Sequence, residues 1–194
     1  VGLANNAVSG GSFDSSGTTF TSGAGVTITT SNGGIVINHT GIVTTNALLS
    51  SNTLIDIDSP VLTTINAGAN ATGGDVTISN TPITAATFTT NGINFVLVTN
   101  TGATITTTGA ISITHSIITT NAALSAGPSI TLNGPLGITV AGGASAGSVT
   151  TTGGPVAINS AITATTFTSS GTSFSSNASG DISAPALATL THTD

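Results

Sequence analysis

The chain has 194 residues, and its net charge of −6 comes from six Asp alone because Lys, Arg and Glu are absent. Proteins bind nucleic acid and anionic membrane surfaces chiefly through Lys and Arg, so this composition excludes both as partners. Cys is also absent, which excludes disulfides and thiol chemistry. The longest apolar run, at 93–98, is far shorter than the roughly 20 residues of a membrane helix, so we expect no membrane insertion.

A pattern of two phenylalanines around a glycine, F-x-x-x-G-x-x-F, occurs three times along the chain. An apolar residue, a polar residue and a histidine follow each copy further on. These copies hold every aromatic ring of the sequence: Phe13, Phe20 and His39, then Phe88, Phe95 and His115, then Phe167, Phe174 and His192. They define a long unit of about 75–80 residues. The chain is therefore predicted to be one array over 1–194, with units at 1–75 and 76–155 and a partial unit at 156–194.

The first long unit also contains a shorter period. Apolar residues spaced two apart, as on one face of a strand, form the pairs Ile35/Ile37, Ile55/Ile57 and Val76/Ile78. A further row of apolar residues runs through Phe13, Leu48, Ile65 and Phe88. Because each row recurs roughly every 16–22 residues, we expect coils of about 19 residues with three short strands each, and about four coils in each long unit.

Turn-forming residues lie between these predicted strands, at Ser31-Asn32-Gly33-Gly34, Gly73-Gly74, Gly142-Gly143 and Gly153-Gly154. Short strands at regular intervals with such corners predict an all-β fold, a right-handed parallel β-helix (β-solenoid) of roughly ten coils stacked about 4.8 Å apart. The glycine between paired phenylalanines is expected to form a corner that turns both rings inward. A β-sandwich is the alternative, but it would not place the same side-chain types in register over several copies.

Stretches such as GVTITTSNGGIVIN (25–38) and GAISITHSIITTNAALSAG (109–127) combine corners marked by Gly or Asn with almost no charge. In these features the whole chain resembles the repeat region of secreted bacterial surface adhesins of the filamentous-haemagglutinin-like and autotransporter type. The resemblance lies in the composition. It implies a right-handed parallel β-helix that is exported and serves as an elongated stalk or fibre.

The three histidines are the first candidates for a site. They lie one per long unit, and four coils of rise would separate neighbours by about 19 Å. The ligands of one metal ion must all lie about 2 Å from it, so His39, His115 and His192 are predicted not to share a metal. We interpret each as a corner residue that bonds a backbone carbonyl, and we expect no metal and no cofactor.

Asp56 and Asp58 are the second candidates, because their spacing places both carboxylates on one face of a strand. A pair of carboxylates can hydrolyse glycosides, but the second long unit has Thr131 and Asn133 at the corresponding places. No Glu, Lys or Arg is present to complete such a site. We therefore predict solvated strand residues, and a protein that is not an enzyme.

Three N-x-S/T sequons begin at Asn38, Asn70 and Asn177, which makes these the candidate N-glycosylation sites. A rod with few charges has little electrostatic repulsion against lateral association. Glycans at these positions would supply a steric barrier instead.

These observations favour a structural or adhesive segment of an extracellular or cell-surface fibre. Its end coils would carry unpaired backbone groups through which like units stack end to end, so self-association into filaments or bundles is the expected interaction. The alternative is an ice- or carbohydrate-binding solenoid module that presents a Thr-rich face. The candidate pairs for that face fall in different predicted rows and are Thr27/Thr29, Thr87/Thr89, Thr104/Thr106 and Thr166/Thr168.

Overall fold

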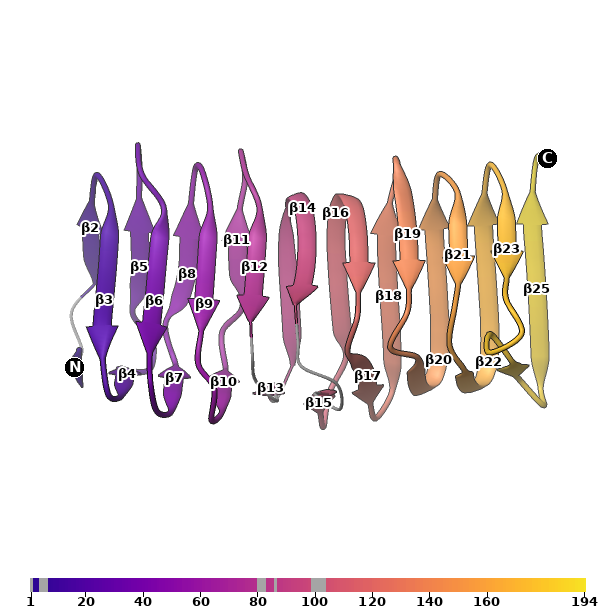
Figure 1. Ribbon diagram of the computed structural model, residues 1–194, viewed down its shortest axis with the longest axis horizontal. Coiled ribbons are helices and arrows are strands. Elements are labelled where there is room, and N and C mark those ends of the chain that lie inside the picture. Colours follow the sequence, from indigo (N-terminus) through magenta and orange to yellow (C-terminus); the bar gives the residue numbers. More distant parts are fainter. Residues whose placement is uncertain (1, 4–6, 80–82, 86, 99–103) are drawn as a thin grey trace.

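The computed structural model describes residues 2–3, 7–79, 83–85, 87–98 and 104–194 of the chain. Its strands pair in parallel and form a β-solenoid of about nine turns with roughly 20 residues per turn. Figure 1 shows the coils side by side along the rod, from the N-terminal to the C-terminal end. At a rise of about 4.8 Å per coil, the rod is about 45 Å long.

Each coil has three faces, and the strands of successive coils pair with one another on each face. Face 1 contains β2 (Val8–Gly10), β5 (Thr27–Thr30), β8 (Leu48–Ser51), β11 (Ala69–Ala71), β18 (Ser129–Gly134) and β25 (Leu187–His192). Face 2 contains β3 (Phe13–Gly17), β6 (Ile35–His39), β9 (Ile55–Asp58), β12 (Val76–Ser79), β19 (Gly137–Val140), β21 (Val156–Ile158) and β23 (Phe174–Ser176). Face 3 contains β1 (Gly2–Leu3), β4 (Phe20–Ser22), β7 (Val43–Thr45), β10 (Thr63–Ile65), β13 (Ile83–Ala85), β15 (Thr104–Thr107), β17 (Ala123–Ala126) and β24 (Ile182–Ser183).

Four long strands bend around a corner and so belong to two faces. Strands β14 (Phe88–Val98) and β16 (Ile111–Thr120) join faces 1 and 2, whereas β20 (Ala144–Gly153) and β22 (Ile162–Gly171) join faces 3 and 1. Three separate short strands per coil were expected, so these continuous corners are a departure from the prediction. They occur where the corner backbone stays extended enough to remain paired with the coils on both sides.

The solenoid prediction is confirmed, with slightly fewer and longer coils than the ten of about 19 residues that the sequence indicated. Coil length is not constant: 23 residues separate Phe95 from its partner Ile118, but only 18 separate Val156 from Phe174. Rows assigned by average spacing therefore mix faces. In the predicted row of apolar residues, for example, Phe13 lies on face 2, Leu48 on face 1 and Ile65 on face 3. The right-handed sense of the solenoid stays a prediction.

Inward residues form columns along the axis, and these columns are the hydrophobic core. One column on face 2 contains Phe13, Ile35, Ile55, Val76, Phe95, Ile118, Ile138, Val156 and Phe174. Its two end members are half-buried, and the others are at most 2 % exposed. Burial of apolar area stabilises a fold by about 25 cal/mol per Å². Each coil contributes at the same place, so the core is continuous along the rod.

Small hydroxyl side chains share the interior with these apolar columns. Thr30 donates a hydrogen bond of 3.0 Å to Ser51 in the next coil. The hydroxyl oxygen of Ser22 accepts from the backbone N–H groups of Asn46 and Ala47, at 2.9 and 3.0 Å. A buried hydroxyl without a partner costs free energy, so these bonds explain how Ser and Thr are accommodated inside.

The corners are short, and the predicted turn residues at 31–34, 73–74, 142–143 and 153–154 lie at strand ends or between strands. Gly143 has a φ of +88°, in the left-handed region that favours glycine. A Cβ at this position would also lie 2.9 Å from the carbonyl oxygen of Ala161 in the next coil. The positive φ and the lack of space for a Cβ therefore both favour glycine at position 143.

Substitution of Gly143 with Ala is expected to lower the free energy of unfolding by about 1–2 kcal/mol, because a side chain is strained at positive φ and would crowd Ala161. Gly11→Ala is the matched control, since a Cβ on Gly11 would meet no atom within 4 Å. Urea unfolding followed by circular dichroism compares the variants. Equal midpoints would contradict the strain assigned to this corner.

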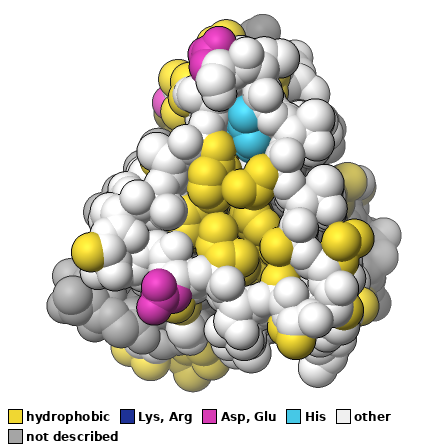
Figure 2. Space-filling view, turned by 90° about the vertical axis from the view of Figure 1, so that its right-hand side faces the viewer, with side chains coloured by type: hydrophobic (Ala, Val, Ile, Leu, Met, Phe, Trp, Pro, Cys, Tyr) yellow, Lys and Arg dark blue, Asp and Glu magenta, His cyan; other side chains and the backbone are white. Residues whose placement is uncertain are grey.

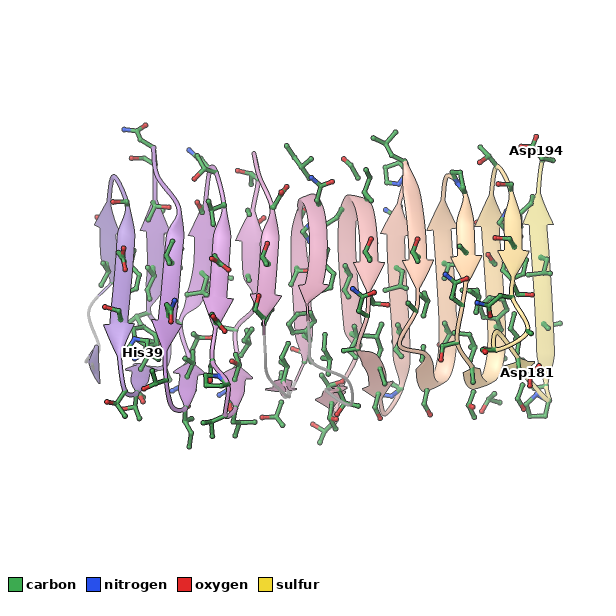
Figure 3. The ribbon with its side chains drawn as sticks, viewed as in Figure 1. His39, Asp181 and Asp194 are labelled. Atoms are coloured by element: carbon green, nitrogen blue, oxygen red, sulfur yellow. The ribbon has the colours of Figure 1, made fainter. Side chains whose placement is uncertain are left out.

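The last coil leaves the interior open at the C-terminal end of the rod. Figure 2 looks onto this end and shows hydrophobic side chains gathered in the centre of a roughly triangular section. Leu187 and Leu190 are 54 % and 53 % exposed, although Leu190 is in register with the buried Ser169. Asp181 and Asp194 lie at the same end (Figure 3). The end coil thus presents apolar surface together with strand edges.

Candidate functional site

Three clusters of two phenylalanines and one histidine are the most regular side-chain arrangement in the described part of the chain. We call each cluster an aromatic corner. The two Phe rings of a corner meet edge to face, with centroids 6.0, 6.1 and 6.3 Å apart in chain order. An imidazole from the next coil lies tilted against the second ring, at 5.7, 5.4 and 5.4 Å. The corners consist of Phe13, Phe20 and His39; Phe88, Phe95 and His115; and Phe167, Phe174 and His192.

The rings lie mainly inside the rod. Four of the six phenylalanines are fully buried, while Phe13 and Phe174 are half-buried against the core. His39 and His115 are each 1 % exposed, and His192 in the end coil is half-buried. The aromatic side chains therefore fill the interior at the corners.

The glycine of the F-x-x-x-G-x-x-F pattern lies beside the imidazole of the next coil. Each of the three glycines is in register with the histidine of the next coil, and the pairs are Gly17 with His39, Gly92 with His115 and Gly171 with His192. A Cβ on Gly92 would lie 2.9 Å from Cε1 of His115. Interiors are close-packed, so in the second corner the His115 ring and the carbonyl oxygens of Ala71 and Gly74 occupy the space that a side chain at position 92 would need. In the first corner a Cβ on Gly17 would meet His39 only at an ordinary contact distance of 3.7 Å, and the φ of +142° favours glycine there instead.

Each imidazole has a hydroxyl partner in the preceding coil. Nε2 lies 2.9 Å from Ser15 Oγ in the first corner, 3.0 Å from Thr90 Oγ1 in the second and 3.0 Å from Ser169 Oγ in the third. The partner of Nε2 is thus a side-chain hydroxyl, and a backbone group, that of Asn94, acts on the imidazole of His115. Nδ1 has no hydrogen-bond partner of good geometry among the described residues in any of the three corners.

In these pairs the hydroxyl lies within hydrogen-bond distance of the imidazole, as in a catalytic serine or threonine site. The other elements of such a site are not found among the described residues. Nucleophilic catalysis also needs a third group that orients the base, and a path by which substrate reaches the nucleophile. No carboxylate bonds Nδ1 within the described residues, and Ser15 and Thr90 are buried with their histidines. The geometry therefore describes a packing device.

Burial lowers the pKa of His39 and lowers the pKa of His115 to about 4. At His115 the backbone of Asn94 and the negative charge of Asp75 favour the protonated form, but burial outweighs them. Both pKa values lie below the ordinary value of 6.5, so both rings are neutral near pH 7. A neutral ring is the form that an apolar corner can accommodate.

The three corners do not occupy the same place around the axis. Phe88 and Phe167 share one column of face 1, four coils apart, as the predicted four-coil unit requires. The first two copies are slightly closer together than four full coils, because Phe13 is in register with Phe95 instead of Phe88. The first long unit therefore spans three and two-thirds coils. As a result, the corner of His39 joins faces 2 and 3, whereas the later corners join faces 1 and 2.

The acidic residues lie mostly on and beside face 2. Asp56 and Asp58 alternate along β9 with the buried Ile55 and Ile57, so both carboxylates point outward. Burial, and secondarily the charge of Asp58, raises the pKa of Asp56. Within the described ranges, no group of three His or Asp side chains is close enough together to hold a metal ion.

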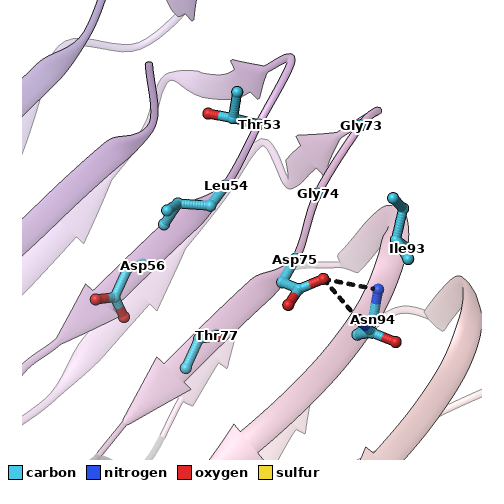
Figure 4. A pocket seen from close by; sticks show the side chains of 9 residues that line it. All are labelled: Thr53, Leu54, Asp56, Gly73, Gly74, Asp75, Thr77, Ile93 and Asn94. Carbon is cyan, nitrogen blue, oxygen red and sulfur yellow. Dashed lines mark hydrogen bonds between the residues drawn. The ribbon is translucent and has the colours of Figure 1, made fainter.

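A surface groove of about 590 Å³ lies over the corner between faces 1 and 2 (Figure 4). Asp56 and Asp75 supply its carboxylates, and Leu54 and Ile93 supply apolar surface. One oxygen of Asp75 accepts two hydrogen bonds from Asn94, from Nδ2 at 2.8 Å and from the backbone N–H at 3.3 Å. No Lys or Arg balances these carboxylates, so the groove has a negative potential and its chemistry suits a cation.

The three sequon asparagines differ in exposure. Asn38 on β6 and Asn177 after β23 are exposed, whereas Asn70 on β11 is half-buried. The side-chain oxygen of Asn177 accepts a hydrogen bond of 2.9 Å from the backbone N–H of Ser179, and that of Asn70 is buried without a partner. Asn38 and Asn177 are therefore the accessible pair.

Outward Thr and Ser side chains form columns that the sequence did not reveal. On face 3, nine successive coils contribute a hydroxyl to one column: Thr21, Thr44, Thr64, Thr84, Thr106, Ser125, Ser145, Thr163 and Ser183. On face 1, the last six coils contribute only Thr, Ser and Asn to two adjacent columns: Thr89/Asn91, Ser112/Thr114, Thr131/Asn133, Thr150/Thr152, Thr168/Ser170 and Thr189/Thr191. Of the pairs that the sequence suggested, Thr27/Thr29 lies on face 1 and Thr104/Thr106 on face 3. We call the twelve residues of the two face 1 columns the polar patch.

Together these features define the chain as a parallel β-solenoid with buried aromatic corners and hydroxyl-rich columns on faces 1 and 3. No family model, curated protein or solved structure matches the chain. The described residues include no helix that is long and apolar enough to cross a membrane. The fold is thus assigned from its own geometry.

Proposed function

We propose that the chain is a structural or adhesive segment of an extracellular or cell-surface fibre, built as a stiff rod. The observation that carries this proposal is the continuity of the inward columns, such as the column of face 2 from Phe13 to Phe174. Each coil buries its apolar residues only against its neighbours, so the architecture supplies length. A stalk or fibre segment needs this property.

The open C-terminal end supports lengthwise assembly. A further coil with apolar inward residues would cover Ala188 and Leu190, which are in register with the buried Phe167 and Ser169 but are exposed themselves, and would pair with the strand edges of the end coil. A head-to-tail contact of this kind forms open filaments when no rotation closes it. The added coil can belong to the same chain or to another copy.

Composition supports a location outside the cell. Trypsin-like proteases recognise a cationic side chain before the cleaved bond, and the chain has no Lys or Arg. The exposed Asn38 and Asn177 would accept N-glycans in a cell that attaches them. The compositional resemblance to filamentous-haemagglutinin-like and autotransporter adhesin repeats agrees with export to the cell surface.

Negative-stain electron microscopy of the purified chain tests this function. We expect straight rods a few nanometres wide that lengthen into fibres as the protein concentration rises. Compact particles with no elongated form would overturn the proposal.

A second candidate is an ice-binding module, or a module for a neutral carbohydrate, and the polar patch is the observation that favours it. The patch repeats on six successive coils, which gives the regular spacing that recognition of a periodic surface needs. Thermal hysteresis separates the candidates, because a fibre segment should show none. A carbohydrate ligand has less support, since every phenylalanine is buried or half-buried and offers no exposed ring for stacking.

A further inference from the structure

We propose that face 1, over the last six coils, is the surface through which two copies of this chain associate side by side. The inference rests on the proposed function, because it names the lateral contact by which such rods bundle. The partner that binds the polar patch is a second copy of the chain. Charge, surface chemistry and area support it in turn.

The strands of faces 1 and 3 carry no carboxylate, and face 1 is the broader of the two over the last six coils. Asp14, Asp56 and Asp58 belong to strands of face 2. Asp75 lies in the corner just before β12, Asp181 just before β24, and Asp194 at the end of the rod beyond β25. All copies are negative and have no Lys or Arg, so contact between faces that carry Asp is repulsive. Two copies avoid that repulsion by meeting through face 1.

The side chains of the polar patch allow two sheets to approach closely. Its twelve members are Thr, Ser and Asn, which are short and lose little rotamer freedom when ordered compared with Lys or Glu. Their hydroxyl and amide groups are both donors and acceptors, so the same surface can hydrogen-bond to a second copy of itself. Self-complementarity is the requirement of a two-fold contact between identical chains.

The area of the patch is sufficient for a weak dimer. Six coils at about 4.8 Å and strands of about six residues at about 3.3 Å give a flat surface of about 600 Å² per copy. The total of about 1,200 Å² lies at the lower limit of specific interfaces. We therefore expect association that is reversible and depends on concentration.

The other surfaces are less suited to this contact. Face 2 carries three of the six carboxylates, and it also holds the exposed sequon residue Asn38. Strands of face 3 are mostly three or four residues long, so its hydroxyl column is narrow. Exposed apolar side chains such as Ile42, Leu54 and Leu136 lie between strands, at the corners. The polar patch is thus the widest uncharged area in the described part of the rod.

Sedimentation velocity of charge variants at the centre of the patch tests the proposal. The wild-type chain should dimerise as its concentration rises, and more strongly at about 0.5 M than at about 0.05 M salt, because salt screens the negative charges. T131D/T150D should weaken dimerisation about tenfold or more, because like charges then face one another. T131K/T150K alone should weaken it similarly, and an equal mixture of the two variants should restore it.

Thr139→Asp is the matched control, because Thr139 is an outward threonine on β19 of face 2, between the buried Ile138 and Val140. This variant should dimerise as the wild type does, and circular dichroism should show all variants folded. A monomeric wild type at every concentration and salt would overturn the proposal. Unchanged dimerisation of T131D/T150D would also overturn it, as would tighter association of T131K/T150K alone, which indicates contact with face 2. Microscopy distinguishes these outcomes from failure of the fibre function, because single rods that lengthen without bundling leave that function intact.

Discussion

Acidification from about pH 7 to about pH 4 is expected to destabilise the solenoid by roughly 3 kcal/mol through His115 alone. The pKa of this ring is 6.5 in the unfolded chain and about 4 in the folded one. Between these values the unfolded state binds more protons, so stability is lost as the pH falls below about 6.5 and the loss is complete below about 4. His39 acts in the same direction, because burial lowers its pKa as well.

The physical cause is the surroundings of the imidazole. A second proton on His115 would place a positive charge inside the corner, where burial outweighs the favourable effects of the Asn94 backbone and of Asp75, and burying a charge that is not fully compensated is costly. The paired strands β14 and β18 contain no Asp or His, and Asp75 is the charged group that partly offsets the cost. Around His39, the paired strands β3 and β9 carry Asp14, Asp56 and Asp58.

Urea midpoints measured across this pH range for the wild type and His115→Gln test the prediction. The variant should lose clearly less stability on acidification, because Gln keeps a polar group near Thr90 but does not titrate. Asp56 has the opposite sign: its folded pKa is raised, so protonating it in acid relieves a cost of folding. The comparison is therefore made in an Asp56→Asn background. Equal acid sensitivity with and without His115 would rule out the histidine as the cause.

Replacement of Phe167 with Ala is expected to lower the free energy of unfolding by about 3–5 kcal/mol. The Phe167 ring is fully buried and packs edge to face against Phe174 at 6.3 Å. In its column the neighbours are Val149 and Ala188, which are too small to fill the cavity. A loss of this size is a large fraction of the stability of an ordinary domain.

Chemical unfolding followed by circular dichroism measures this loss, with Thr163→Ala as the control. Thr163 is on the same strand, β22, but its side chain is exposed on face 3, and surface changes usually cost less than about 0.5 kcal/mol. A cost for Phe167→Ala as small as that of the control would show that the aromatic corner does not support the last coils.

The fold class could be predicted from the sequence because a solenoid repeats the same pattern of inward and outward residues in each coil. Alternating residues such as Ile35, Ile37, Ile55 and Ile57 point inward as their spacing indicated. The face on which each residue lies could not be predicted, because coils vary from 18 to 23 residues. An error of a few residues in one coil moves every later assignment to another face. The hydroxyl columns of faces 1 and 3 were hidden for that reason.

The aromatic corners were only partly predictable. The repeat of Phe, Gly and His identified the participating residues, and the distances between histidines argued against a shared metal ion. The sequence did not indicate that a side chain at Gly92 would meet both the backbone of the preceding coil and the His115 ring of the following coil. That relation depends on register between coils, which local spacing does not contain. The hydroxyl partner Thr90 was missed for the same reason.

The displacement of the first aromatic corner by a third of a turn has a consequence for how such rods can change in evolution. The same short sequence builds the same cluster at either of two corners, so the module does not depend on its angular position. Duplication or recombination can therefore join units in more than one rotational phase and still give a foldable chain. A rod lengthened in this way would carry its aromatic corners along different edges, so that their angular position changes from one unit to the next.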